Sequence, residues 1–203
     1  MILFRAMEQP ANSTKTAAPE GSSSSTLRAE IKSWTRDLLI AFALAMVIIV
    51  FLYQPVKVEG TSMSPLLTDQ ERIFINKFVY RFEPIQRGDV VVFWYPLDKS
   101  KSFIKRVVAL PGDTVEIRLG QVLVNGKVLD EPYVPGQFAD RTSLGPARIP
   151  EDHFFVLGDH RNSSNDSRVF GPVPGEFIYG KAVFVYWPVE RFGLLPAIGS
   201  DVQ

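Results

Sequence analysis

The strongest hydrophobic signal in the chain is an uninterrupted apolar run near its N-terminus. Leu38–Tyr53 contains no charged residue, no glycine and no proline. With Trp34 and Thr35 the run reaches about 20 residues, which as a helix spans roughly 30 Å, the thickness of the hydrocarbon core of a bilayer. Trp34 and Tyr53 stand at its two ends, where amphipathic rings favour the membrane interface. The pattern predicts a transmembrane helix over residues 34–54.

Two other readings of this run are a buried core helix and a signal segment that is cleaved off. The flank Gln54–Val58 offers no small-x-small cleavage site, and a run this apolar exceeds what a domain of this size buries. Arg28, Lys32 and Arg36 precede the run, and basic residues beside a span stay in the cytoplasm. We therefore expect a cell-membrane anchor with a cytoplasmic N-terminus and an extracytoplasmic domain after it.

The segment before the anchor has the composition of a disordered tail. Gln9–Thr26 is rich in Ser, Thr, Pro and Ala and has almost no large apolar side chain. Such a stretch cannot offset the entropy of ordering by burial. We expect residues 1–33 to be disordered.

After the anchor the periodicity changes to that of β-strands. Asn125-Gly126 between two apolar runs is a hairpin signal, because both central residues of a type I′ turn need positive φ. No stretch of helical period follows the anchor, so residues 55–203 are expected to form one mostly β domain, a small barrel or a coiled set of sheets. The expected strands are Arg72–Ile75, Asp89–Trp94, Phe103–Leu110, Val115–Arg118, Val122–Val124, Phe154–Leu157 and Lys181–Tyr186.

Composition removes several classes of chemistry. The 22 basic and 22 acidic residues balance, so no global field favours nucleic acid, and the absence of cysteine excludes disulfides and thiol catalysis. The chain has only two histidines, His153 and His160, and no spacing typical of metal ligands. Hydrolytic chemistry would need a base other than histidine, and we expect no metal and no cofactor.

Ser62 is a candidate nucleophile shortly beyond the predicted anchor. Gly60 precedes it, which allows close backbone approach, and Pro65 follows and fixes the local turn. A hydroxyl on a rigid turn with free backbone N–H groups suits a nucleophile and its oxyanion hole. The plainer reading is an ordinary turn serine.

Lys105 is a candidate base. In a strand, Phe103, Lys105 and Val107 share one face, so the amine lies in an apolar row. Desolvation there lowers the pKa of a lysine, and a value of about 7 to 8 would make it a base at neutral pH. The alternative is a side chain that reaches water from an edge strand.

A polar segment, Gly158–Arg168, follows the apolar strand that ends at Leu157. Its plain reading is a surface loop. Its charges are spaced so that Asp159 could pair with Arg161 and Asp166 with Arg168. A hydroxyl from Ser163 or Ser164 could also orient a neutral lysine, as a third group orients the base of a catalytic triad.

Four segments together resemble the bacterial type I signal peptidase family of Ser/Lys-dyad serine proteases. These are SMSPLL at 62–67, RGDVVVF at 87–93, IKRVVALPGD at 104–113 and GDHRNSSNDSRVFG at 158–171, in the order and spacing of that family. The resemblance covers residues 34 to about 195 and includes the apolar segment before them. It implies a membrane-bound endopeptidase that removes signal peptides from exported preproteins after a small-x-small motif such as Ala-x-Ala.

The resemblance also implies roles for single residues. Ser62 resembles the acylated nucleophile, with its N–H as one oxyanion donor, and Lys105 the general base. Ser164 resembles the hydroxyl that holds the lysine amine. Gly60 stands where Gram-negative members often supply a second oxyanion donor from a serine hydroxyl, whereas many other members have glycine there, as this chain does. His160 and Ser163 stand where asparagine is frequent.

The remaining implied residues support the site or bind substrate. Asp166 and Arg168 match a structural ion pair, and Arg106 is expected to be structural too. An extended signal peptide would add as a strand along Pro55–Gly60. The apolar side chains expected to shape its pockets are Val58, Met63, Leu67, Phe103 and Ile104.

Two rival hypotheses stay open at this point. One is another Ser/Lys processing peptidase on the same scaffold, such as a self-cleaving repressor, which would need a DNA-binding module where this chain has its apolar run. The other is a non-catalytic anchored β domain that binds exported proteins, which would have no use for Ser62, Lys105 and Ser164 together. The expected partners are signal peptides and the lipid bilayer.

Overall fold

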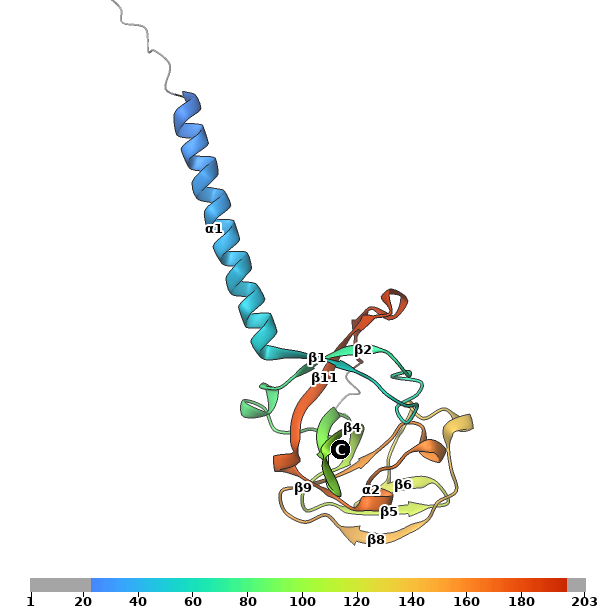
Figure 1. Cartoon of the computed structure of the whole chain (residues 1–203). Helices are drawn as coiled ribbons and strands as arrows, with labels where there is room; N and C mark the ends of the chain where they lie inside the picture. Colours follow the sequence, from blue (N-terminus) through green and yellow to red (C-terminus); the bar gives the residue numbers. More distant parts are fainter. Residues whose placement is uncertain (1–22, 197–203) are drawn as a thin grey trace, which may run out of the picture. The chain divides into compact units, whose positions relative to one another are not determined.

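The computed structural model describes the chain from residue 23 to residue 196, and residues 23–29 and 48–52 by their backbone alone. Its first element is helix α1, Ser23–Leu52, in blue to cyan in Figure 1. Residues 1–22 of the expected disordered tail lie outside the described residues. Residues 23–33, however, are helical, which corrects that part of the expectation. Leu27–Glu30 (Leu-Arg-Ala-Glu) are all strong or moderate helix formers, so the helix begins before the apolar run.

Helix α1 presents large apolar side chains along its described length. Trp34, Leu38 and Phe42 are each more than half exposed. Within residues 23–196, no helix combines the length and the hydropathy that a membrane crossing requires. The helix ends at Leu52, and Tyr53, expected to close the helix, opens the first strand instead.

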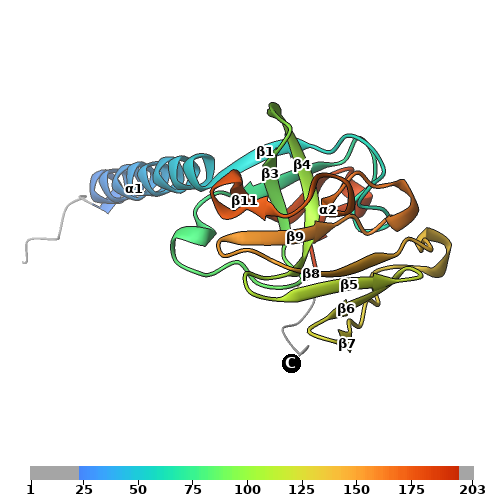
Figure 2. The ribbon, with the colours of Figure 1, turned by 90° about the horizontal axis from the view of Figure 1, so that it is seen from below.

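The larger sheet is antiparallel and has eight strands. Its order is β1-β2-β11-β3-β4-β9-β10, with β12 paired to β11, so the last long strand among residues 23–196 lies between β2 and β3. Figure 2 shows β1, β3, β4 and β11 of this sheet on the opposite side of the unit from β5, β6 and β7. The bounds are β1 Tyr53–Lys57, β2 Arg72–Asn76, β3 Val90–Tyr95, β4 Asp98–Ala109, β9 His153–Leu157, β10 Val173–Pro174, β11 Ile178–Trp187 and β12 Gly193–Leu194.

The smaller sheet has four strands in the order β7-β6-β5-β8. The hairpin predicted at Asn125-Gly126 is confirmed: both residues have positive φ, 52° and 79°, and they join β6 to β7. The bounds are β5 Thr114–Arg118, β6 Gln121–Val124, β7 Lys127–Val128 and β8 Leu144–Arg148.

Helical turns after α1 are short. The four-residue helix α2, Ser167–Phe170, and five 3-10 turns occupy the connections between described strands. The expectation of a mostly β domain is therefore confirmed. The hydrogen-bonded path of the larger sheet runs from β1 to β10 without closing, so the described strands form two sheets and not a closed barrel. The turns are η1 Val79–Arg81, η2 Gly136–Phe138, η3 Arg161–Ser163, η4 Gly175–Phe177 and η5 Val189–Arg191.

Three buried apolar clusters hold these layers together. One joins the sheets, because Val108 of β4 and Phe155 of β9 pack with Val115 and Ile117 of β5. A second packs the loop after β1 onto the larger sheet through Met63 and Leu67. The third covers the other side of β3 and β4 and includes Val91 and Val107.

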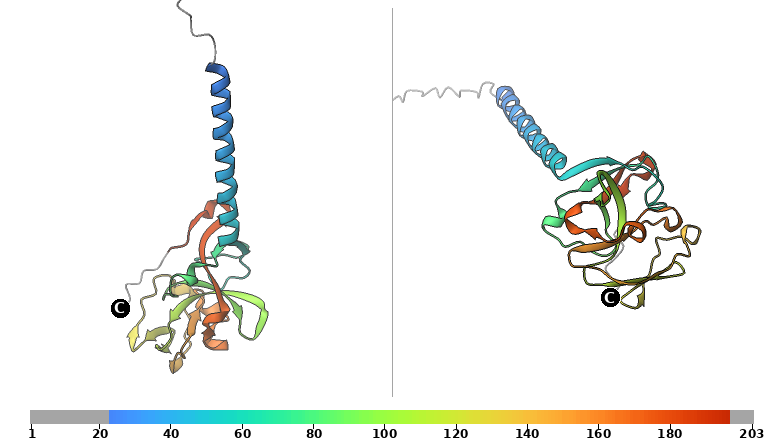
Figure 3. Two further views of the ribbon diagram at one scale, coloured as in Figure 1. Left: turned by 90° about the vertical axis from the view of Figure 1, so that its left-hand side faces the viewer. Right: turned by 60° about the horizontal axis from the view of Figure 1, so that its bottom comes forward.

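Figure 3 shows the β3–β4 hairpin in green extending from the body of the unit.

Candidate active site

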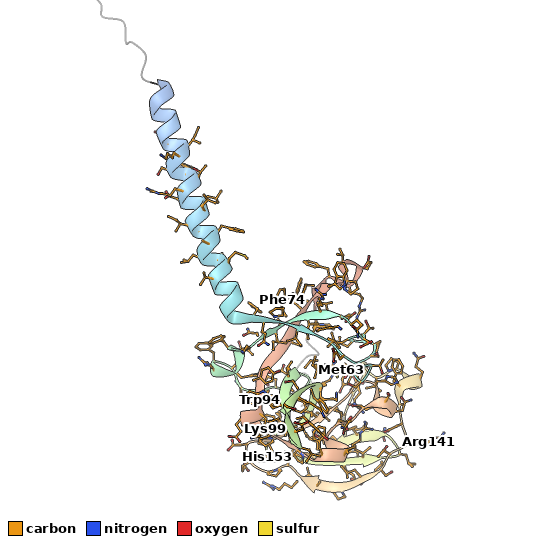
Figure 4. All side chains as sticks on the ribbon, in the orientation of Figure 1. Met63, Phe74, Trp94, Lys99, Arg141 and His153 are labelled. Atoms are coloured by element: carbon orange, nitrogen blue, oxygen red, sulfur yellow. The ribbon has the colours of Figure 1, made fainter. Side chains whose placement is uncertain are left out.

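Ser62 lies in the loop that joins β1 to β2. The loop closes on itself, because the Val58 N–H donates to the Glu71 carbonyl at 2.7 Å and the Gln70 N–H returns a bond to the Val58 carbonyl at 2.9 Å. Met63, labelled in Figure 4, is buried and anchors the loop in the core. Gly60 has a φ of 91°, a conformation that favours glycine, but a Cβ there would meet no atom within 4 Å, so the close backbone approach expected at this position is not seen.

Two backbone N–H groups near the Ser62 hydroxyl differ in whether they already have a hydrogen-bond acceptor. The Gly60 N–H donates to Asp69 Oδ1 at 2.8 Å, and this bond holds the pKa of the Asp69 carboxyl below its usual value. The Ser62 N–H donates to no protein acceptor among residues 23–196. The loop thus leaves the N–H of Ser62 free for an external oxygen, whereas that of Gly60 is occupied.

Lys105 lies in the middle of β4 and is only 4% exposed. Its Nζ is 2.7 Å from Ser62 Oγ and 2.8 Å from the Ile104 carbonyl. The Phe103 ring centroid lies 5.3 Å from the same nitrogen, on the strand face that the alternation predicted. Lys105 does not reach water from an edge strand: its side chain is buried, and it lies opposite Val91 of β3, one residue before the pairing of β4 with β9 begins at Arg106.

Burial changes the acidity of this amine. Desolvation lowers the pKa of Lys105 from 10.5 to about 8, although the carboxylates of Asp166 and Asp159 act in the opposite direction. A neutral amine accepts a proton from a hydroxyl within hydrogen-bond distance, and the Nζ–Oγ distance satisfies this condition. Ser62 and Lys105 therefore have the geometry of a nucleophile and its base.

Gly158 brings a second loop against the Ser62 loop. A Cβ at this position would lie 2.2 Å from Ser164 Oγ and 2.5 Å from the Ser62 carbonyl oxygen, so only glycine fits. Ser164 is close to the site, as expected. Its buried hydroxyl has no hydrogen-bond partner within residues 23–196, so the expected bond to the lysine amine is not formed in this structure.

Buried ion pairs support the Gly158–Arg168 segment. Asp166 accepts from Arg168 at 2.7 Å and from the Gly158 N–H at 3.1 Å, which agrees with the expected structural pair. Asp159 does not pair with Arg161, contrary to one expectation. Its partner is Arg106, through two bonds of 2.8 and 2.6 Å, because β4 pairs with β9 immediately before Asp159.

Sequence reasoning missed the outer partners of these ion pairs. Arg161 donates to Glu131, and Arg168 donates to Asp140. Glu131 and Asp140 belong to the connection between β7 and β8, 30 and 28 residues before their partners, and no local pattern marks them. A further missed pair, Glu71 with Arg191, ties the Ser62 loop to turn η5.

A groove of about 500 Å³ runs beside Ser62 and Lys105. Four of the apolar side chains expected to shape a substrate pocket line this groove: Val58, Met63, Phe103 and Ile104. Leu67 does not line it: the residue is completely buried in the core beneath the loop, which corrects the expectation. Lys57–Gly60 also line the groove, next to β1, the edge strand of the larger sheet. Within the described part of the chain, no group of three His, Cys, Asp or Glu side chains could hold a metal ion.

Comparison with known proteins gives one consistent result. Residues 31–187 match the family described as "Signal peptidase, peptidase S26". A probable signal peptidase I-2 of Synechocystis is 41% identical over 166 residues, 79% of this chain and 75% of its own. Signal peptidase I of Bacillus amyloliquefaciens is 35% identical over 173 residues, 81% of this chain and 92% of its own.

Among solved structures, a signal peptidase I from Enterococcus faecalis V583 is similar over 49% of this chain and 97% of that chain, with 32% identity and a TM-score of 0.44. The match to the family extends over more than half of the sequence, and both relatives align over most of their length. The chain belongs to the signal peptidase family, peptidase S26, and is an enzyme of the signal peptidase I type.

Proposed function

We propose that this chain is a membrane-anchored serine endopeptidase that removes signal peptides from exported preproteins, with Ser62 as nucleophile and neutral Lys105 as general base. The observation that carries the proposal is the 2.7 Å approach of the Lys105 amine to the Ser62 hydroxyl at a nearly water-free position. A lysine buried without a carboxylate in contact favours its neutral form, which is the form a base requires.

The chemistry follows from these two groups. The Lys105 amine takes the Ser62 proton as Oγ attacks the scissile carbonyl, and the negative oxygen that forms is stabilised by the free Ser62 N–H. The C–N bond then breaks, and the Lys105 ammonium gives its proton to the leaving amine. Water, activated by the same amine, hydrolyses the ester and regenerates Ser62.

Substrate recognition follows from the groove. A signal peptide in extended form would pair with the edge strand β1 and continue along Lys57–Gly60, so its main chain gains hydrogen bonds. Alternate side chains of such a strand face the same side. Ile104 and Phe103 narrow the groove beside the proposed nucleophile, so small side chains such as alanine fit at the positions that face them.

The proposed anchor is the apolar part of α1. Its support is the uncharged run Leu38–Tyr53 and the exposure of the large apolar side chains described in α1. In water such a surface would be unfavourable, whereas in lipid it needs no partner. The basic residues before the run favour a cytoplasmic N-terminus, with the catalytic unit on the other side of the cell membrane.

The test is cleavage of a preprotein with an Ala-x-Ala site by the full chain in detergent micelles. Wild type is expected to release the mature protein, with its N-terminus directly after the motif. Ser62→Ala and Lys105→Met are expected to lower kcat about a thousandfold or more, because one removes the proposed nucleophile and the other the proposed base, and neither group acts without the other. Ser100→Ala and Lys101→Ala, at the exposed end of β4, are the matched controls and keep full activity.

Cleavage that survives in Ser62→Ala would remove this assignment, and a wild-type chain that binds preproteins without cutting them would favour the non-catalytic alternative. Mass spectrometry adds a direct readout. An acyl group trapped on Ser62 during turnover is expected, and an acyl group on any other residue contradicts the mechanism.

A further inference from the structure

Both peptide groups that flank Ser62 are bound by one residue of the opposite loop, His160. The His160 backbone N–H donates to the Ser62 carbonyl at 3.1 Å. Its ring Nδ1 lies 3.1 Å from the Thr61 carbonyl oxygen. Because a carbonyl oxygen can only accept, this contact is a hydrogen bond when Nδ1 carries the hydrogen of the imidazole.

The Thr61 carbonyl accepts two hydrogen bonds, one from the His160 ring and one from the Ser64 N–H at 3.0 Å in its own loop, and the orientation of this carbonyl sets where the Ser62 N–H points. The Thr61 carbonyl and the Ser62 N–H belong to the same peptide unit, which is planar and trans, so their bonds point in opposite directions. A donor that holds the oxygen therefore also holds the N–H. Polarisation by the same bond makes that N–H a stronger donor. This is the N–H that has no protein acceptor among the described residues.

The ring of His160 is itself held in place. Phe138, from turn η2, packs against it with 4.1 Å between the ring centroids and 46° between the planes. The Ser163 N–H donates to the His160 carbonyl at 2.9 Å, and Asn162 Nδ2 donates to the Gln137 carbonyl at 3.2 Å, which links η2 to η3. The imidazole is therefore presented to Thr61 in a fixed orientation.

We propose that His160 is a positioning residue that aims the Ser62 N–H at the oxyanion, with Phe138 as the support of its ring. The proposal rests on the proposed function, since it gives that N–H an oxygen to stabilise. It also explains how the oxyanion could be stabilised when Gly60 supplies no donor: this residue has no side chain, and its N–H is bound to Asp69. His160 itself does not contact the substrate. The bond that it strengthens, from the Ser62 N–H to the oxyanion, forms only in the transition state, so the effect falls on kcat more than on substrate binding.

The test compares His160→Phe with His160→Asn. Phenylalanine keeps the contact with Phe138 but has no donor for Thr61, whereas the asparagine amide can donate to the same carbonyl. We expect His160→Phe to lower kcat about tenfold with KM within about twofold, the pattern of an interaction made only in the transition state. His160→Asn is expected to recover most of the loss. His153→Phe, at the start of β9, is the matched control with unchanged kinetics.

A pair of peptide inhibitors separates positioning from a general structural effect. A signal-peptide aldehyde adds to the Ser62 hydroxyl and creates an oxygen at the position of the oxyanion, whereas the corresponding peptide alcohol binds without a bond. His160→Phe is expected to bind the aldehyde about tenfold more weakly and the alcohol as wild type does. Where His160→Phe does not fold, His160→Ala is measured in the same way.

Three outcomes overturn the proposal. The first is a His160→Phe variant whose kcat and aldehyde affinity equal those of wild type, and the second is a His160→Phe variant that binds the aldehyde and the alcohol more weakly by the same factor. The third is a His160→Asn variant whose kcat is as low as that of His160→Phe. Each of them leaves the assignment of Ser62 intact, because wild type still forms the aldehyde adduct. A wild-type chain that forms no adduct on Ser62 contradicts the proposed function itself.

Discussion

The proposed mechanism predicts that cleavage activity rises with pH through a midpoint of about 8, because in it the buried amine of Lys105 must lose its proton before it can accept that of Ser62. The burial that lowers this pKa from 10.5 corresponds to about 3 kcal/mol of preference for the neutral amine, at about 1.4 kcal/mol per pH unit. At pH 7 about one molecule in ten carries a neutral Lys105, compared with about one in 3,000 for an unperturbed lysine.

The difference between the pKa of Lys105 in the folded chain and in the unfolded chain also makes the free energy of unfolding depend on pH. Between pH 8 and 10.5 the unfolded chain binds a proton at Lys105 that the folded chain does not, so the free energy of unfolding rises with pH across this window. Below pH 8 both states are protonated and the full unfavourable burial of the cation remains. Lys105→Met is therefore expected to raise the free energy of unfolding at pH 7 by up to about 3 kcal/mol, and this gain vanishes above pH 10.5.

Two measurements check this reasoning. The first is kcat/KM for an internally quenched Ala-x-Ala peptide from pH 5.5 to 9.5, which reports the pKa of the free enzyme. The second is urea unfolding of wild type and Lys105→Met at pH 7 and pH 9. The His160→Asn variant serves as a control because it has no imidazole at this position. If the midpoint of its kcat/KM profile stays near pH 8, the group that titrates is not His160. A flat profile between pH 5 and 9, or a stability loss in Lys105→Met at pH 7, would refute the account.

Further predictions concern the support of the site and the anchor. Arg106→Met leaves Asp159 buried and unpaired, and we expect a loss of about 3 to 5 kcal/mol in urea unfolding; a loss below 1 kcal/mol contradicts the buried pair. Gly158→Ala drives a methyl group into Ser164 and the Ser62 backbone, so the free energy of unfolding should fall by about 1–3 kcal/mol and the cleavage rate should drop more than tenfold. Gly145→Ala, with open space around it, should change neither quantity. Normal activity in Gly158→Ala would disprove the close contact. The full chain in bacterial membranes is expected to resist extraction by alkaline carbonate, and its appearance in the soluble fraction argues against a spanning anchor.

The elements that the sequence predicts well are those with a local cause. Alternation located the strand that carries Lys105, and the two positive φ angles of Asn125-Gly126 follow from the residue types alone. The approach of Ser62 to Lys105 was predicted from the resemblance of four segments, since no local rule brings residues 43 positions apart within 2.7 Å.

Other features depend on tertiary contacts that leave no trace in a short window. Asp159 has Arg161 two residues away and yet pairs with Arg106, because strand pairing presents a guanidinium to it inside the core. Leu67 looks like a pocket residue by its position near Ser62, but it is completely buried in the core with Met63 and Ile73. The two bonds from His160 to the Ser62 loop likewise exist only because Gly158 lets the loops meet.

The place of β11 has a consequence for biosynthesis. This strand joins β2, next to the Ser62 loop, to β3, which pairs with the strand of Lys105, yet it follows all of them in the sequence. Until residue 187 has emerged, the two halves of the larger sheet have no shared partner. In a nascent chain that ends before β11, no shared strand brings the Ser62 loop next to the strand of Lys105, so the proposed dyad is expected to assemble only after residue 187 has left the ribosome.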